Sequence, residues 1–127
     1  MPIKNKFDIY IVDDNFDQAN ILKLLIEHYG YKATFSTNSE DAFEGILQTQ
    51  PRLVILDLMM PEIDGLKLCR MLKENPKTSS IKVIIYSGKL YETDRRKAIR
   101  LGADIFLTKP TKSQVLLDSI KSLIAVN

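Results

Sequence analysis

The chain has 127 residues, of which 45% are hydrophobic and 27% charged, and these values are typical of one globular domain. The single cysteine excludes an internal disulfide, which suits a cytoplasmic protein. We find neither a signal-like segment nor an apolar stretch of membrane-spanning length, so we expect no membrane insertion. The net charge of +2 is uneven: residues 1–64 carry 5 basic and 11 acidic side chains, and residues 65–127 carry 13 and 5. This division predicts two electrostatically distinct surfaces and gives little support for direct nucleic-acid binding.

Five short apolar runs alternate with segments that have helical spacing. The runs are residues 7–12, 31–35, 53–56, 81–86 and 104–107. The third and fourth runs are nearly continuous in Leu, Ile and Val, which is typical of strands buried on both faces. Two apolar stripes with helical spacing predict the first and last helices. They are Phe16, Ala19, Leu22, Leu25, Ile26 and Tyr29, and then Leu116, Ile120, Leu123 and Ile124.

Polar and glycine residues mark the ends of these helices. Two residue pairs resemble capping boxes, in which side chains satisfy the free amides of the first helical turn. They are Asn15 with Gln18 and Thr111 with Gln114. Gly30 and Gly102 stand where helices should end, because glycine enters the left-handed conformation readily. Asn75-Pro76 predicts the end of the third helix.

The alternation predicts an α/β fold, namely a (βα)₅ doubly wound, flavodoxin-like three-layer sandwich around a parallel five-stranded sheet. In the strand order 2-1-3-4-5, ligands bind at the carboxyl ends of strands 1 and 3, where the order reverses. Strand 1 is followed by Asp13-Asp14, and strand 3 is followed by Asp57. Ser87 and Lys109 end strands 4 and 5 at the same edge. We therefore expect one polar site at this edge.

The residue types at this edge point to phosphoryl chemistry. Taken alone, Asp57 could be a helix cap, but three neighbouring carboxylates repel one another and call for a cation. Oxygen ligands favour Mg²⁺ or Mn²⁺. Together with Lys109, such an ion leaves a positive field for a phosphoryl group. Asp57 could then act as the nucleophile and form an aspartyl phosphate, with Ser87 and Lys109 on the phosphoryl oxygens.

These residues resemble the signature of bacterial two-component response-regulator receiver domains, of the chemotaxis-regulator-like kind, over nearly the whole chain. The matching elements are Asp13-Asp14-Asn15, Asp57 with Met60-Pro61 and Asp64-Gly65, Ser87-Gly88, and Lys109-Pro110. The resemblance implies that Asp57 accepts a phosphoryl group from a sensor histidine kinase or a histidine phosphotransfer protein. It implies that Asp13, Asp14, Asp57 and the backbone carbonyl of Met59 hold the metal ion.

The resemblance also implies a cis peptide between Lys109 and Pro110, and a switch. In that switch Ser87 moves toward the phosphoryl group and Phe106 rotates into the vacated space. The surface of the fourth helix, fifth strand and fifth helix then changes, and it would bind an unknown downstream protein or form a homodimer. Phe106, Ser87 and Gly88 stand where Tyr, Thr and Ala are common in the family, but no reacting group is lost.

On this view the chain is a single receiver domain over residues 1–127, without an output domain. It is not an enzyme with a separate substrate, because it would catalyse only its own phosphorylation and dephosphorylation. Cys69 is interpreted as a packing residue, and His28 as a favourable cation at the end of the first helix.

Three alternatives remain open at this point. A pseudo-receiver would keep the fold as an interaction module without phosphorylation. An aspartyl-phosphate phosphatase or phosphotransferase of the haloacid-dehalogenase type would need a second Asp two residues after Asp57, where the chain has Met59. A flavodoxin-like cofactor module would need a glycine- or hydroxyl-rich phosphate loop after strand 1, where Asp13-Asp14 would repel phosphate.

Basic residues surround the expected fourth helix. They are Lys89, Arg95, Arg96, Lys97 and Arg100. One interpretation is a solvated face in which Glu92 pairs with Arg96 at helical spacing. The other is a docking surface whose preference changes on phosphorylation.

Overall fold

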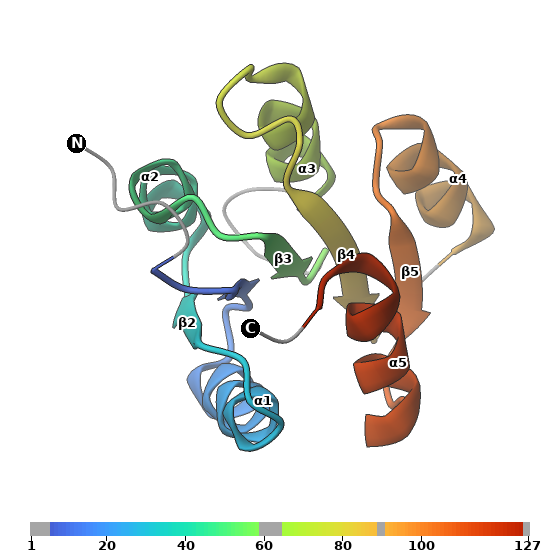
Figure 1. The fold of residues 1–127 in the computed structure, drawn as a ribbon. Coiled ribbons are helices and arrows are strands. Elements are labelled where there is room, and N and C mark those ends of the chain that lie inside the picture. Colours follow the sequence, from blue (N-terminus) through green and yellow to red (C-terminus); the bar gives the residue numbers. More distant parts are fainter. Residues whose placement is uncertain (1–5, 59–64, 89–90, 126–127) are drawn as a thin grey trace.

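The computed structural model describes residues 6–58, 65–88 and 91–125, in which five strands alternate with five helices (Figure 1). The elements are β1 (Ile9–Val12), α1 (Phe16–His28), β2 (Ala33–Ser36), α2 (Ser39–Thr49), β3 (Leu53–Leu56), α3 (Gly65–Glu74), β4 (Lys82–Ser87), α4 (Glu92–Arg100), β5 (Ile105–Thr108) and α5 (Ser113–Leu123). All strands pair in parallel in the order β2-β1-β3-β4-β5. The predicted fold and strand order are therefore confirmed. Within the described segments, every helix is too short or too polar to cross a bilayer.

Helices cover both faces of the sheet and make three layers (Figure 1). Helices α1 and α5 pack on one face, and α2, α3 and α4 pack on the other. Side chains alternate along each strand, so Leu53 and Ile55 enter the core under α1 and α5, whereas Val54 and Leu56 enter the other core. All four residues of β3 are buried, as its continuous apolar run predicted.

Four strands are shifted by one or two residues from their predicted bounds. β1 begins at Ile9 because the amides of Asp8 and Ile9 both donate to the Lys32 carbonyl, at 2.8 and 3.1 Å, before regular pairing starts. Tyr31 precedes β2 and is buried, and its hydroxyl donates to the Ile124 carbonyl at 3.4 Å. Strand ends are therefore set by hydrogen bonds between segments that are distant in sequence, which apolar runs do not encode.

The first predicted capping box is half formed. The Asn15 side chain accepts a hydrogen bond from the Gln18 amide at 3.0 Å, so Asn15 is the N-cap of α1. The return bond of the box is replaced, because the Asn15 amide donates to Asp13 Oδ1 at 2.9 Å. The Gln18 side chain instead accepts from Lys109 at 3.0 Å.

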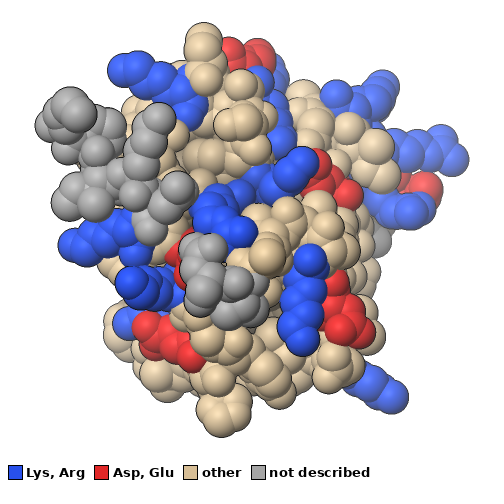
Figure 2. Space-filling view, viewed as in Figure 1, with Lys and Arg blue, Asp and Glu red and all other residues tan. Residues whose placement is uncertain are grey.

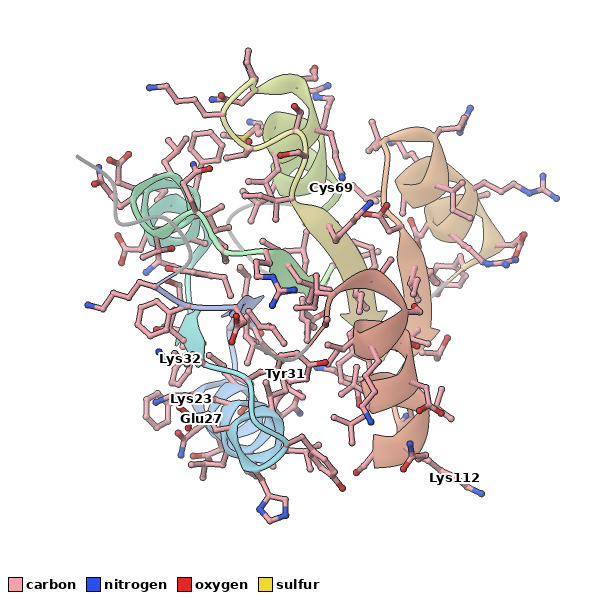
Figure 3. The ribbon with its side chains drawn as sticks, viewed as in Figure 1. Lys23, Glu27, Tyr31, Lys32, Cys69 and Lys112 are labelled. Atoms are coloured by element: carbon pink, nitrogen blue, oxygen red, sulfur yellow. The ribbon has the colours of Figure 1, made fainter. Side chains whose placement is uncertain are left out.

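The second predicted capping box is wrong. Helix α5 begins at Ser113, and its N-cap is Lys112, which makes no side-chain cap bond and points away from the molecule (Figure 3). The Thr111 hydroxyl donates to the Thr108 carbonyl at 2.5 Å. Thr111 therefore stabilises the turn after β5 and does not cap the amide of Gln114.

Other boundary predictions are confirmed. Gly30 and Gly102 have φ values of 100° and 103°, in the left-handed region that favours glycine. Helix α3 ends at Glu74, directly before Asn75-Pro76. His28 is the last residue of α1 and is exposed.

The apolar stripe predicted for α1 is only partly buried. Ala19 and Ile26 are buried, but Phe16 and Tyr29 are 60% and 42% exposed. The Phe16 ring packs against the edge of Phe35, with 5.5 Å between the ring centroids. The stripe on α5 is confirmed, because three of its residues are buried and the fourth packs against the same core. They are Leu116, Ile120, Ile124 and Leu123.

Cys69 belongs to α3 and packs in the core between this helix and the sheet (Figure 3), where it is fully buried. Burial raises the pKa of its thiol to about 11. A thiol with such a pKa stays protonated and unreactive at neutral pH. The packing role predicted for Cys69 therefore agrees with its environment.

Candidate functional site

Main-chain pairing brings the predicted site residues to one edge of the sheet. The Asp57 amide donates to the Val12 carbonyl at 2.9 Å, which extends the β1–β3 pairing and places Asp57 beside Asp13. The Lys109 amide donates to the Ser87 carbonyl at 2.9 Å at the ends of β4 and β5. Backbone pairing therefore fixes the Cα positions of the four site residues, which are Asp13, Asp57, Ser87 and Lys109.

Three carboxylates form the acidic part of the site. Asp13, Asp14 and Asp57 each offer one oxygen, and these three oxygens lie within 4.8 Å of one another. Asp13 and Asp57 are buried, whereas Asp14 is exposed. Burial raises the pKa of Asp14, and the negative charges of Asp13 and Asp57 raise it further. The site thus resists a third negative charge, which is the condition that favours a bound cation.

Lys109 supplies the positive charge of the site. Its ammonium donates to Asp13 Oδ2 at 2.9 Å and to Asp57 Oδ2 at 3.5 Å. Burial alone would lower the pKa of Lys109, but its hydrogen bonds and charge interactions with the two acids outweigh burial and raise the pKa. Lys109 therefore remains an ammonium, and one such charge faces three carboxylates.

Ser87 holds the other oxygen of Asp57. The Ser87 hydroxyl is fully buried and donates to Asp57 Oδ1 at 2.8 Å. Phe106 is partly buried and packs against the core under α3 and α4. The β4–β5 register pairs Ile85 with Phe106 and Ser87 with Thr108, so Ser87 and Phe106 lie near each other on adjacent strands.

Two glycines border the site, and they differ in the space around them. A Cβ atom on Gly65 would lie 2.5 Å from the Asp57 carbonyl oxygen and 2.7 Å from Leu58 Cα. Glycine therefore allows α3 to begin directly against the end of β3. A Cβ on Gly88 would meet nothing closer than Lys109 Cβ at 4.0 Å, so alanine would fit there.

An open groove of about 690 Å³ leads from the site to the space between α1 and α5. Its polar end holds Asp13, Asp14, Asp57 and Lys109, and its remainder is largely apolar. The apolar lining includes Ile21, Leu22, Leu25, Tyr86 and Leu116. A partner could thus approach Asp57 from this side.

Sequence reasoning missed two residues of the site. Gln18 Oε1 accepts from the Lys109 ammonium at 3.0 Å, and the Tyr86 ring centroid lies 5.1 Å from the same nitrogen. The sequence pattern assigns Gln18 to a helix cap and Tyr86 to a strand. The signal that could have found Tyr86 is its place directly before Ser87.

The cis peptide expected between Lys109 and Pro110 is present. Other predicted positions lie outside the described residues, namely Met59, Met60-Pro61, Asp64 and Lys89.

The charged face of α4 carries the predicted ion pair. Glu92 lies 3.5 Å from Arg96 and 3.6 Å from Arg95, and all three side chains are exposed. Figure 2 shows Lys and Arg side chains over several parts of the visible face, with Asp and Glu among them. The pairing suits a solvated face, and the docking role of this helix stays a prediction.

Known proteins resemble this chain over most of its length. PilH of Pseudomonas aeruginosa is 34% identical over 117 residues, which cover 92% of this chain and 97% of PilH. The receiver domain of a signal transduction histidine kinase from Syntrophus aciditrophicus has 38% identity and a TM-score of 0.84, over 92% of this chain and 89% of that one. The phosphate regulon regulatory protein PhoB of P. aeruginosa is 30% identical, and the chain spans 51% of its length.

The family comparison agrees with the geometry. The sequence-family model of the response regulator receiver domain matches residues 9–121, from the start of β1 almost to the end of α5. Receiver domains of two-component response regulators work as switches that phosphorylation controls, and they bind Mg²⁺ at an acidic pocket. The chain therefore belongs to the response regulator receiver domain family.

Proposed function

We propose that Asp57 accepts a phosphoryl group from a phosphohistidine on a sensor histidine kinase or a histidine phosphotransfer protein. The observation that carries this proposal is the environment of the buried Asp57 carboxylate. One oxygen accepts from Ser87 at 2.8 Å, and the other faces the Lys109 ammonium at 3.5 Å. Both donors can serve phosphoryl oxygens as well as carboxylate oxygens, since both groups are acceptors.

In the transfer, an Asp57 carboxylate oxygen forms a bond to phosphorus while the bond from phosphorus to the donor imidazole nitrogen breaks. The imidazole takes up a proton, and Asp57 becomes an acyl phosphate. Lys109 and Ser87 then donate to phosphoryl oxygens and stabilise their charge. In dephosphorylation, a water oxygen forms a bond to phosphorus while the bond from phosphorus to the Asp57 oxygen breaks, which releases inorganic phosphate and a proton and restores the Asp57 carboxylate. The protein acts on no separate metabolite.

The acidic residues fit a divalent cation, Mg²⁺ or Mn²⁺. Asp13, Asp14 and Asp57 would hold it, with the backbone carbonyl of Met59. The fit rests on three hard oxygen donors within 4.8 Å and on the repulsion that raises the pKa of Asp14. When bound, the ion neutralises negative charge on the transferring phosphoryl group.

Phosphorylation would be read through Ser87 and Phe106. The Ser87 hydroxyl has one proton to donate, so it serves either Asp57 or a phosphoryl oxygen. Its movement toward the phosphoryl group would free space for the Phe106 ring, which packs on the α4 side of the sheet. The surface of α4, β5 and α5 would then change its affinity for a downstream protein or for a second copy of the chain.

Intact-mass measurement tests the assignment. With Mg²⁺ and acetyl phosphate, the protein should gain one phosphoryl group that is labile in base. Asp57→Asn should abolish the gain, because the amide is not a nucleophile. Asp118→Asn, an exposed change on α5, should retain it. A persistent gain in Asp57→Asn would contradict the proposal, and no gain in the unaltered protein would favour the pseudo-receiver.

A further inference from the structure

The Lys109 ammonium has two neighbours that carry no charge. Besides Asp13 and Asp57, the Gln18 side-chain oxygen accepts from it at 3.0 Å. The Tyr86 ring lies beside it, with 5.1 Å between the nitrogen and the ring centroid, within the range of a cation–π interaction. Lys109 is therefore held from α1 and β4 as well as by the acids.

Gln18 can reach Lys109 because the first turn of α1 leaves its side chain free. In a complete capping box that side chain would return to the Asn15 amide. Here Asp13 Oδ1 accepts from the Asn15 amide at 2.9 Å. The Asn15 side chain still accepts from the Gln18 amide, which fixes the Gln18 backbone. The cap thus aims the Gln18 side chain at the site.

The contacts of Lys109 with the uncharged Gln18 and Tyr86 matter because its contacts with Asp13 and Asp57 must change during the reaction. In the proposed function Asp13 helps hold a cation, and Asp57 carries the phosphoryl group. Either event removes a carboxylate oxygen that the Lys109 ammonium now faces. The neutral Gln18 amide oxygen binds a metal ion more weakly than a carboxylate oxygen does. Its bond to Lys109 does not involve Asp57, so modification of Asp57 does not remove it. It can therefore keep its bond to Lys109 in both states.

We propose that Gln18, with support from Tyr86, is a positioning residue that holds the Lys109 ammonium at the mouth of the site during phosphoryl transfer. The inference rests on the proposed function and deepens it. Gln18 does not touch the reacting atoms and acts through Lys109. Its contribution is orientation, because an ammonium on a flexible four-carbon side chain loses much rotational freedom when it is fixed.

Gln18→Met in the full chain tests this role, since methionine has similar length and helix propensity but no strong acceptor. The matched control is Gln48→Met on α2, where the exposed glutamine bonds to Glu44 at 3.3 Å. With acetyl phosphate and saturating Mg²⁺, the initial rate of Asp57 phosphorylation should fall about fivefold in Gln18→Met and less than about twofold in Gln48→Met.

Two further readouts separate positioning from a general loss of structure. In protein without metal or phosphodonor, NMR relaxation should show a less ordered Lys109 side chain in Gln18→Met than in Gln48→Met. In a Lys109→Gln background, Gln18→Met should change the residual rate by less than about twofold, because the residue through which it acts is gone.

Several results would overturn the inference. They are equal rates in the two methionine variants, an unchanged order of Lys109, and a loss of rate that persists without Lys109. If the unaltered protein accepts phosphoryl groups and Gln18→Met does so equally fast, only this inference fails. If the unaltered protein accepts none, the proposed function fails and this inference fails with it.

Discussion

Replacing Ser87 by alanine tests how the resting site holds Asp57. The change removes one hydroxyl and leaves the backbone and the Cβ atom in place. Ser87 is fully buried, and its hydroxyl donates to Asp57 Oδ1 at 2.8 Å. Water cannot easily replace this donor at a buried position, so the carboxylate would lose stabilisation.

The expected magnitude follows from the kind of bond that is lost. A hydrogen bond to a charged group contributes about 1.5–3 kcal/mol. Lys109 still faces the other Asp57 oxygen at 3.5 Å and offsets part of the loss. We therefore expect the free energy of unfolding to fall by about 1–2 kcal/mol. In a domain of this size, the melting temperature should fall by about 3–8 °C.

Urea unfolding of the metal-free protein measures this difference in the free energy of unfolding. The slope of that free energy against urea concentration should not change. Ser122→Ala is the matched control, because Ser122 is exposed and bonds within α5 to the Ser119 carbonyl at 2.7 Å. In an Asp57→Ala background, Ser87→Ala should cost almost nothing, since the acceptor is gone. Equal stability of the two alanine variants, or the same loss without Asp57, would refute the reasoning.

Three other changes test the surroundings of the site. Gly65→Ala should lower the free energy of unfolding in urea by about 1–3 kcal/mol, because its Cβ would lie 2.5 Å from the Asp57 carbonyl oxygen; an unchanged midpoint would contradict this. Asp14→Asn should raise the melting temperature slightly without metal and reduce the rise that Mg²⁺ causes. The pKa of Asp14 is raised in the folded state, so its contribution to stability is present in acid and is lost as the pH rises through that pKa. The rise in melting temperature of metal-free Asp14→Asn should therefore appear at neutral pH and vanish in acid. A rise that is independent of pH would contradict this prediction. Tyr86→Leu should slow phosphorylation by acetyl phosphate about two- to fivefold if the ring contact holds Lys109, and an unchanged rate would exclude that contact.

The sheet and its functional edge were predictable because they depend on patterns along single strands. The run Leu53–Leu56 is buried on both faces and ends at an acid, and these two facts place Asp57 at the carboxyl edge of a covered parallel strand. The same logic brings Asp13, Ser87 and Lys109 to that edge. Strand bounds were less predictable, since they depend on bonds such as those to the Lys32 carbonyl.

The finer features of the site depend on which of several neighbouring acceptors takes each hydrogen bond, and on tertiary packing. Asn15 and Gln18 form a complete capping pattern as a sequence, but the carboxylate of Asp13 takes one of the two bonds. That competition depends on how the chain enters α1, which helical spacing does not describe. Phe16 likewise matches the apolar stripe, yet its 60% exposure reflects a place at the rim of the core.

Ser87 and Lys109 face opposite layers of the molecule. Ser87 follows the alternation of β4 to the side of α2, α3 and α4, where Phe106 also packs. Lys109 lies beside the Tyr86 ring on the side of α1 and α5. A phosphoryl group held by both donors would act on both layers at once. Changes at Gln18 should therefore alter the rate at which Asp57 is phosphorylated. Changes at Phe106 should alter how α4 responds after Asp57 is phosphorylated.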